Sequence, residues 1–373
     1  MHILFAGGGT AGHINPALAV AQYIAKKHPD AKISYIGKKG GMEERLVAAA
    51  GFDFYGIDVA GFQRKISLKN IARNISAAEK AITSSVRAKR LLKQLNPDVV
   101  VGTGGYVSGP VLRQAAKLGL RTAIHEQNAF PGVTTKMLVP LVDTVMLAMV
   151  EAKPRLKLKK APVITGNPVR EDFLTLSKQT AKKDLNLPDL PVLLSAGGSL
   201  GAAPINNAVL DLITAKWKDN DILFLHATGK GGYEKFITEL KARGVDLNAP
   251  NLIIKDYIDN MGQCMAAADL VIARAGAITL SELSVCGKPS ILIPSPYVAE
   301  NHQFHNAMSL KRAGAAEVIE EKDLNSTKLL DTVENIIHNN SKLTKMGSSA
   351  KENAIPDSCK RIYDEVMRLY TTK

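Results

Sequence analysis

Two glycine-rich turns, about half a chain apart, constrain this 373-residue sequence more than any other feature. The first is Gly-Gly-Gly-Thr-Ala-Gly-His at residues 7–13, and the second is Gly-Gly-Ser-Leu-Gly at residues 197–201. Each follows an apolar run typical of a strand and precedes a stretch with helical spacing. Such a turn presents backbone N–H groups at a helix N-terminus, where phosphate groups bind. The pair predicts two similar α/β domains with a phosphate-bearing ligand in the cleft between them.

The composition is that of a globular protein, with 46% hydrophobic and 22% charged residues. No apolar run approaches the ~18 residues of a membrane-spanning helix, and we expect no signal peptide. The three cysteines are widely spaced, which argues against disulfides or a zinc site and favours a reducing cytoplasm. The net charge of +13 favours anionic partners, but aromatic residues make up only 5%. Because no nucleic-acid-binding module is recognisable either, we expect no nucleic-acid partner.

Strand-like and helix-like segments alternate in both halves, which predicts parallel sheets with helices on both faces. A Gly-Asn-Pro sequence marks an expected hinge at residues 165–170. We therefore expect a Rossmann-like domain over residues 1–164, completed by a C-terminal helix at 357–373, and a second one over residues 165–350. The expected strands are residues 2–6, 32–36, 98–102, 122–125 and 144–148 in the first half, and 192–196, 222–227, 252–254, 270–273 and 290–294 in the second.

In the first turn, Asn15 and Pro16 are typical of an N-cap and the first residue of a helix. They predict that the helix begins at Pro16, with His13 exposed in the loop above the strand end. The turn also matches a dinucleotide-binding pattern. However, Gly37 and Lys38 stand where an acidic ribose ligand is expected, which disfavours a nicotinamide-dependent dehydrogenase.

Further loops follow other expected strands. Residues 274–282 open a helix whose N-terminus suits a phosphate, and Glu282 lies about one turn further on, where its carboxylate suits ribose hydroxyls. Residues 102–109, 125–128 and 294–303 are polar or glycine-rich where a plain strand end is expected. Each loop alone is compatible with an ordinary surface turn. Because ligands of open α/β sheets collect at the carboxyl ends of strands, the set indicates one shared cleft.

Read together, these loops resemble those of the MurG family, over almost the whole chain. Two positions depart from the family pattern: Leu200 stands where glutamine is frequent, and His302 replaces the first of two adjacent glutamines, so Gln303 is the more reliable sugar contact. The motifs that carry the resemblance are Gly-Gly-Thr-Ala-Gly-His (8–13), Gly-Gly-Tyr-Val-Ser-Gly-Pro (104–110), His-Glu-Gln-Asn (125–128), Gly-Asn-Pro-Val-Arg (166–170), Gly-Gly-Ser-Leu-Gly-Ala (197–202) and Arg-Ala-Gly-Ala-Ile-Thr-Leu-Ser-Glu (274–282).

The resemblance implies a GT-B glycosyltransferase that moves N-acetylglucosamine from UDP-N-acetylglucosamine to the 4-hydroxyl of MurNAc in undecaprenyl-pyrophosphoryl-MurNAc-pentapeptide. This step converts lipid I into lipid II in peptidoglycan synthesis. The implied general base is His13. Implied donor contacts are Ser199 and Ala277 to the diphosphate, Glu282 to the ribose, Arg170 and Ile258 beside the uracil, Thr10, Asn128 and Gln303 to the sugar or diphosphate, and Ala11, Gly12, Ile278, Thr279, Leu280 and Ser281 in the same turns. Implied acceptor or membrane contacts are Gly104, Gly105, Tyr106, Arg64, Lys65 and Lys69.

The chemistry implied is a single inverting displacement, because the donor bond is α and the product bond is β. Imidazole titrates near neutrality, which suits a base, and helix N-termini stabilise the charge on the leaving UDP. The triplet Asp219-Asn220-Asp221 precedes an expected strand and so lies at the wrong edge to bridge a metal to the diphosphate. We therefore expect neither a metal nor a cofactor.

Two segments, residues 62–73 and 153–160, mix apolar and basic residues and suit an anionic lipid surface. We expect peripheral attachment to the cytoplasmic face of the bacterial inner membrane, with cell-wall assembly proteins as further candidate partners. Two other interpretations stay open. One is a UDP-N-acetylglucosamine 2-epimerase or another UDP-sugar transferase of the same fold, and the other is a non-catalytic binder of nucleotide sugars or nucleic acid.

Overall fold

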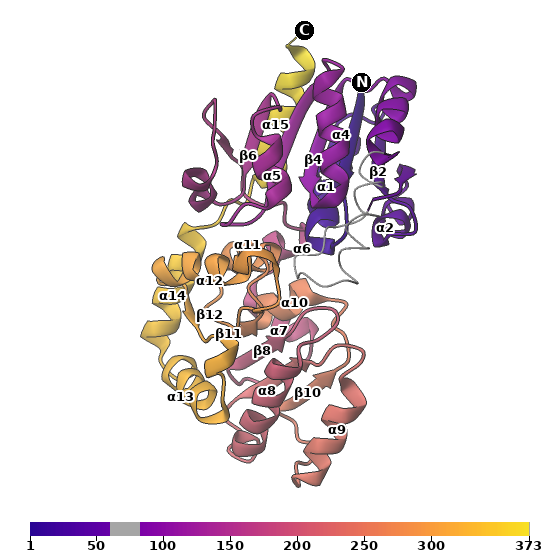
Figure 1. Cartoon of the computed structure of the whole chain (residues 1–373). Coiled ribbons are helices and arrows are strands. Elements are labelled where there is room, and N and C mark those ends of the chain that lie inside the picture. Colours follow the sequence, from indigo (N-terminus) through magenta and orange to yellow (C-terminus); the bar gives the residue numbers. More distant parts are fainter. Residues whose placement is uncertain (60–82, 373) are drawn as a thin grey trace. The chain divides into compact units, whose positions relative to one another are not determined.

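The structure is a computed structural model that describes residues 1–59 and 83–372. Contacts divide the chain into two compact units (Figure 1). Unit 1 comprises Met1–Pro168 and Asp357–Lys373, and unit 2 comprises Val169–Pro356. The segment 62–73, with the predicted contacts Arg64, Lys65 and Lys69, lies outside the described residues.

Unit 1 is built on a seven-stranded parallel sheet with the order β3-β2-β1-β4-β5-β6-β7. Its strands are β1 (His2–Gly7), β2 (Lys32–Lys38), β3 (Asp53–Ile57), β4 (Val99–Gly104), β5 (Arg121–Glu126), β6 (Thr144–Leu147) and β7 (Val163–Ile164). Its helices are α1 (Ala11–Lys27), α2 (Met42–Ala49), residues 83–95, α4 (Gly105–Lys117), α5 (Val133–Leu138), the 3-10 turn η1 (Val150–Arg155) and α15 (Ser358–Thr371).

The sheet of unit 1 is buried on both faces because its central strands carry apolar residues at consecutive positions. Along β1, Ile3 and Phe5 pack with α1 and α15, whereas Leu4 and Ala6 pack with α4 and residues 83–95. Successive side chains of a strand point to opposite faces, so a continuous apolar run requires helices on both sides. All four side chains are fully buried.

The C-terminal helix α15 belongs to unit 1, although it follows unit 2 in sequence (Figure 1). Its apolar face buries Ile362, Val366 and Leu369 against the core that β1 and α1 share. The hydroxyl of Ser358 donates to the carbonyl of Asn167 at 2.7 Å, which fixes the start of the helix. The apolar face and this bond hold α15 on the sheet of unit 1.

Unit 2 contains a six-stranded parallel sheet with the order β10-β9-β8-β11-β12-β13. Its strands are β8 (Val192–Ala196), β9 (Leu223–Ala227), β10 (Leu252–Lys255), β11 (Leu270–Ala273), β12 (Ser290–Leu292) and β13 (Ala316–Val318). Its helices are α6 (Asp172–Thr175), α7 (Lys178–Asp184), α8 (Ala203–Lys216), α9 (Tyr233–Ala242), α10 (Met261–Ala267), α11 (Ala277–Cys286), α12 (His302–Arg312), α13 (Ser326–Ile337) and α14 (Asn340–Glu352), with 3-10 turns η2 (Ala299–Asn301) and η3 (Glu321–Asp323).

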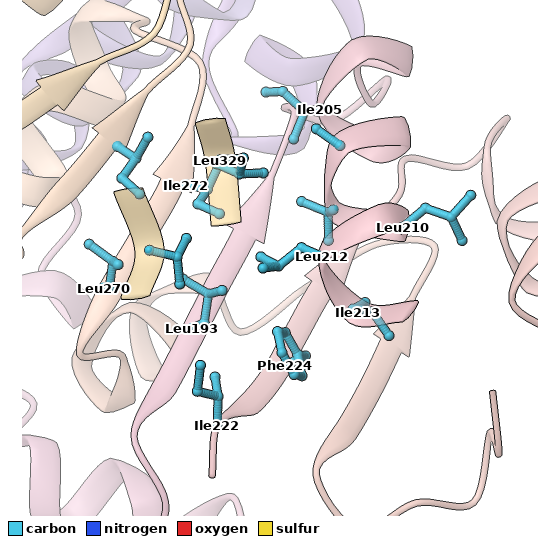
Figure 2. Packing of buried hydrophobic residues seen from close by; sticks show 14 of the residues in the cluster. Leu193, Ile205, Leu210, Leu212, Ile213, Ile222, Phe224, Leu270, Ile272 and Leu329 are labelled. Carbon is cyan, nitrogen blue, oxygen red and sulfur yellow. The ribbon is translucent and has the colours of Figure 1, made fainter. Parts of the chain in front are cut away.

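A large cluster of buried apolar side chains lies between the sheet and the helices of unit 2. Figure 2 shows Leu193, Phe224 and Ile272 of three neighbouring strands beside the apolar residues of α8. Leu329 of α13 joins the same cluster. Strands β8 and β11 pair beside each other over this core, and their carboxyl ends carry two of the predicted motifs.

The predicted fold class, two Rossmann-like domains with parallel sheets, is confirmed. The expected strands are present with small shifts at their ends, but β3, β7 and β13 were not among the predicted strands. These strands lie toward the sheet edges and are short or contain polar residues, so their apolar signal is weak. Among the described residues, no helix combines the length and apolarity needed to cross a membrane.

Candidate active site

Each sheet has a point where its strand order reverses. In unit 1 the chain runs outward from β1 to β3 and then returns to β4 beside β1, and in unit 2 it returns from β10 to β11 beside β8. At such a switch point the loops after the two central strands diverge and leave a crevice in which ligands bind. The two predicted glycine turns and the motif at residues 274–282 lie at these positions.

The first glycine turn shows that the predicted start of the following helix, at Pro16, is wrong. Helix α1 begins at Ala11, with Thr10 as its N-cap in an extended conformation, and not at Pro16. The amides of His13 and Ile14 both donate to the carbonyl of Thr10, at 3.0 and 3.2 Å, which closes the first turn before the proline. Pro16 only removes the donor that would reach the carbonyl of Gly12. His13 is therefore a residue of the first helical turn and is partly buried.

His13 is held by Thr103 at the end of β4 and by Gln127, which follows β5. Its Nδ1 atom lies 3.0 Å from Oε1 of Gln127, and its backbone carbonyl accepts a 2.7 Å bond from the hydroxyl of Thr103. A Cβ atom on Gly104 would lie 2.8 Å from Nδ1 of His13, and the φ of Gly104 is +101°. Only glycine allows β4 and the imidazole to approach this closely. The structure thus brings His13, Gly104 and the 125–128 loop together.

Asn128 is positioned through the carboxylate of Glu126. Its side-chain amide and backbone N–H both donate to Oε1 of Glu126 at 3.1 Å. The second carboxylate oxygen accepts from the amide of Gly132 at 3.0 Å and from the hydroxyl of Thr135. Glu126 is buried, so this charge is satisfied by four donors and orders the loop that carries Asn128.

The other predicted contacts of unit 1 lie at the starts of two helices. Thr10 and Ala11 are exposed and Gly12 is partly buried at the N-terminus of α1. Gly105 and Tyr106 begin α4, and the Tyr106 side chain is 57% exposed. The first amides of a helix carry a partial positive charge, so both ends suit an anion or a polar sugar.

In unit 2, the loop after β8 packs directly on the loop after β9. Ser199 and Leu200 are exposed, and Leu200 is 90% exposed. Gly201 has a φ of +77°, and a Cβ atom there would lie 2.1 Å from the carbonyl oxygen of Thr228. The glycine therefore sets the path of the turn that presents Ser199.

The loop after β11 is anchored by Arg274, whose guanidinium donates to the carbonyl of Ile293 at 3.1 Å and pairs with Glu321. Helix α11 then begins at Ala277, with Gly276 as its N-cap. Ala277 and Leu280 are buried, whereas Ile278, Thr279 and Ser281 are partly buried. The predicted helix start is confirmed, and it comes directly after β11, one of the two strands that flank the switch point of unit 2.

Glu282 and Arg170 lie close together although they are far apart in sequence. Burial raises the pKa of Glu282 to about 7, and the nearby charge of Arg170 acts in the opposite direction. Asp172, which accepts a 3.1 Å bond from Arg170, adds to the rise. Glu282 is a carboxyl group that changes charge near neutral pH beside a cation.

Ile258 and Gln303 lie at other points of the same edge. Ile258 follows β10 and is only 3% exposed, whereas Tyr257 beside it is 41% exposed. Gln303 lies in the first turn of α12, and its Oε1 accepts from the amide of Ser295 at 2.9 Å. That bond orients the side-chain amide so that its NH₂ group is the end suited to a ligand oxygen.

Asp219 and Asp221 precede β9, at the opposite edge from the predicted motifs. Both form ion pairs with Lys216, at 2.6 and 3.7 Å. Within residues 1–59 and 83–372, no cluster of three histidine, cysteine or acidic side chains has the geometry of a metal site.

Of residues 125–128, only Asn128 was among the predicted site residues, and His125 and Gln127 were not. Both are buried and belong to the hydrogen-bond network of His13. The available signal was the polarity of residues at the end of an otherwise apolar strand, but sequence alone does not tell which of them faces His13.

Comparison with known proteins agrees with this arrangement. Residues 3–147 match the Glycosyltransferase family 28 N-terminal domain, and residues 192–362 match the Glycosyltransferase family 28 C-terminal domain. A relative from Acetivibrio thermocellus is 43% identical over 100% of this chain and 99% of its own length. It is named UDP-N-acetylglucosamine--N-acetylmuramyl-(pentapeptide) pyrophosphoryl-undecaprenol N-acetylglucosamine transferase, and a Bacillus cereus relative of that name, numbered 1, is 42% identical over 99% of both chains.

Solved structures give the same result. The crystal structure of Acinetobacter baumannii MurG has a TM-score of 0.79 and 27% identity, and covers 98% of this chain and 99% of that one. An S. aureus MnaA–UDP co-structure, at a TM-score of 0.68 and 12% identity, shares the fold alone. The two sheets and their switch-point loops define a family 28 glycosyltransferase with the GT-B fold. The chain belongs to the MurG family, as its motifs predicted.

Proposed function

We propose that this chain transfers N-acetylglucosamine from UDP-N-acetylglucosamine to the 4-hydroxyl of MurNAc in undecaprenyl-pyrophosphoryl-MurNAc-pentapeptide, forming lipid II for peptidoglycan. The single observation that carries the proposal is the identity of 43% over the full length of a transferase so named. A UDP-N-acetylglucosamine 2-epimerase is a weaker candidate, because its solved structure from Neisseria meningitidis shares the fold at only 14% identity.

We assign the role of general base to His13. Its ring lies at the switch point of unit 1, beside Gly104, the N-cap of α4. As the acceptor hydroxyl attacks C1 of the sugar, the imidazole takes its proton, and the bond from C1 to the UDP oxygen breaks. We assign acceptor contacts to Gly104, Gly105 and Tyr106 in the same loop.

We propose that unit 2 binds the nucleotide and the diphosphate of the donor. The turn at Ser199 and the N-terminus of α11 at Ala277 lie after adjacent strands and suit the two phosphates. Positive helix ends stabilise the charge that develops on UDP as it leaves. Thr10, Asn128 and Gln303 are the proposed contacts to the sugar or diphosphate. Because the side chain of Ile258 is buried, we propose that Ile258 contacts the uracil through its backbone.

Glu282 gives this donor site a pH dependence that can be measured. If its carboxylate accepts bonds from the ribose hydroxyls, only the ionised form binds well. Since the pKa of Glu282 is about 7, the Kd of UDP-N-acetylglucosamine is expected to be about tenfold higher at pH 6 than at pH 8. Calorimetry with this donor avoids interference, because both of its phosphates are esterified and do not titrate in this range.

The matched variant is Glu282→Gln, which has the same size and no titratable proton. We expect it to bind the donor weakly at both pH values, with the pH slope removed. An affinity that stays constant from pH 6 to pH 8 in the unmodified protein would reject the ribose assignment.

We propose that unit 1 attaches peripherally to anionic lipid on the cytoplasmic face of the inner membrane. Around α5 and η1, Val133, Met137 and Val150 expose 49–62% of their surface beside the basic run 153–160. The ammonium of Lys136 lies 4.2 Å from the ring of Phe130, which places a further cation on this surface. Apolar side chains rimmed by lysines suit the headgroup layer of a bilayer.

The double variant Lys157→Glu/Lys160→Glu tests this surface by cosedimentation with anionic vesicles. Each lysine near such a surface contributes about 1 kcal/mol, so removing two weakens partitioning at least about 30-fold. The control is Lys235→Glu/Lys241→Glu on α9, which makes the same change of net charge on unit 2. Equal loss of binding in both variants would indicate a general charge effect and contradict a specific surface.

The direct test of function uses the full chain with radiolabelled UDP-N-acetylglucosamine and a lipid I analogue. We expect label in a disaccharide lipid, with release of UDP and no conversion of the donor when the acceptor is absent. Epimerised nucleotide sugar formed without acceptor would establish the epimerase instead. Retention of intact donor without any product would indicate a binding protein.

A further inference from the structure

A chain of hydrogen bonds runs from the backbone of Gly166 to the ring of His13. Nε2 of His125 lies 2.9 Å from the carbonyl oxygen of Gly166, and Nδ1 of His125 lies 3.0 Å from Nε2 of Gln127. The same Gln127 nitrogen donates to the backbone carbonyl of His125 at 3.0 Å. The other end of the amide, Oε1 of Gln127, lies 3.0 Å from Nδ1 of His13. His125 and Gln127 are buried.

Which atom donates in each of these hydrogen bonds follows from the end of the network at Gly166. A backbone carbonyl only accepts, so Nε2 of His125 carries the hydrogen and Nδ1 of His125 carries the lone pair. That lone pair and the carbonyl of His125 both require a donor, which places the NH₂ group of Gln127 against them. Oε1 of Gln127 then faces His13, and because it only accepts, Nδ1 of His13 must donate.

The alternative arrangement is unfavourable at more than one contact. Rotating the Gln127 amide would set its oxygen against the carbonyl oxygen of His125 and its NH₂ group against Nδ1 of His13. Unpaired acceptors facing each other in a buried site cost more than a single lost bond. His125 stays neutral because burial lowers its pKa, although its bond to Gly166 and the charge of Glu126 act in the opposite direction.

We propose that Gln127 and His125 are positioning residues that hold His13 in the Nδ1–H tautomer, so that its Nε2 atom carries the lone pair that accepts the proton of the acceptor hydroxyl. This inference rests on the proposed role of His13 as the base. Oε1 of Gln127 also stabilises the imidazolium that forms, since the charged ring keeps donating through Nδ1. When the 4-oxygen bonds to C1 and UDP departs with its electron pair, the proton is on Nε2, and it then passes to water.

The test reads the tautomer directly by long-range ¹H–¹⁵N NMR of the full chain with ¹⁵N-labelled histidine. The His13 signals are identified by their loss in His13→Ala. At a pH where the ring is neutral, we expect Nδ1 of His13 to appear protonated in the unmodified protein. In Gln127→Met, which has a similar volume and no amide, we expect the Nδ1–H preference to be lost. The kcat should fall about five- to tenfold, as for the loss of one neutral hydrogen bond, with an unchanged KM for UDP-N-acetylglucosamine.

A matched pair at position 125 tests the second residue. The side-chain oxygen of His125→Asn can still accept from Gln127, so we expect it to keep the Nδ1–H tautomer. The ring of His125→Phe keeps the bulk but cannot accept, so we expect it to lose part of the preference, because the backbone carbonyl still orients Gln127. Circular dichroism of all variants identifies any that fail to fold. If one of the two variants at position 125 does not fold, the tautomer of His13 is measured in the other one.

Two results would overturn the proposal. The first is an Nε2–H tautomer of His13 in the unmodified protein. The second is an unchanged tautomer and kcat in a folded Gln127→Met. The double variant His13→Ala/Gln127→Met separates this inference from the role of the base, because a positioning residue adds no further loss once His13 is absent. If His13→Ala leaves turnover intact, the assignment of the base fails while the NMR result still decides the tautomer.

Discussion

Replacing His13 with alanine is expected to lower the kcat for transfer to a lipid I analogue by roughly 10²–10⁴-fold, the usual contribution of a general base. The donor should still bind, because the proposed uridine contacts and the turns at Ser199 and Ala277 proposed for the two phosphates are on unit 2. Calorimetry with UDP-N-acetylglucosamine is expected to show little change in Kd. The backbone amide and carbonyl of His13 bond to Thr10 and Thr103, and alanine keeps both bonds while it removes the imidazole.

The control is His338→Ala, which removes a histidine from the surface of unit 2, where it pairs with Asp221 and Glu334. We expect its turnover to stay close to that of the unmodified protein, because most exposed substitutions change the free energy of unfolding by no more than about 0.5 kcal/mol. If His13→Ala retained full turnover, another group would have to be the base.

Replacing Gly201 with alanine is expected to have the largest effect on unit 2. Its φ of +77° costs an alanine about 1–2 kcal/mol, and the new Cβ atom would lie 2.1 Å from the carbonyl oxygen of Thr228. Relief of that overlap costs about 1–3 kcal/mol more, because both partners are backbone. The expected total of about 3 kcal/mol corresponds to a fall of about 6–12 °C in the Tm of unit 2 by calorimetry. The donor affinity should fall as well, since the turn that presents Ser199 must shift.

Gly231 provides the matched control for this substitution. It lies in the neighbouring loop, and a Cβ atom there would meet no other atom within 4 Å. Gly231→Ala is expected to leave both the Tm and the donor affinity nearly unchanged. Similar losses in the two variants would mean that the effect of Gly201→Ala is not specific to its contact with Thr228.

Local sequence predicted most elements of the fold because the buried strands carry strong, short-range signals. Leu193 and Leu194 in β8, or Ile3 and Leu4 in β1, are apolar at consecutive positions, which only a sheet covered on both faces accommodates. The same local reasoning misplaced the start of α1, because Asn15 and Pro16 look like a helix start. The amides of His13 and Ile14, which precede Asn15, already bond to the carbonyl of Thr10, so the helix begins at Ala11.

The sequence by itself determined the two Rossmann-like halves, the family and the motifs at the strand ends, since all of these follow from nearby residues or from resemblance along the chain. Tertiary structure alone decided which polar groups meet. Gln127 reaches His13 across 114 positions of sequence, and Arg170 comes close to Glu282. The order of the strands in each sheet was also decided only by the tertiary structure, in which β4 lies beside β1 and β11 lies beside β8. Hydrogen bonds and charge interactions act over a few ångströms in space, so contacts between distant segments appear only after the sheets have formed.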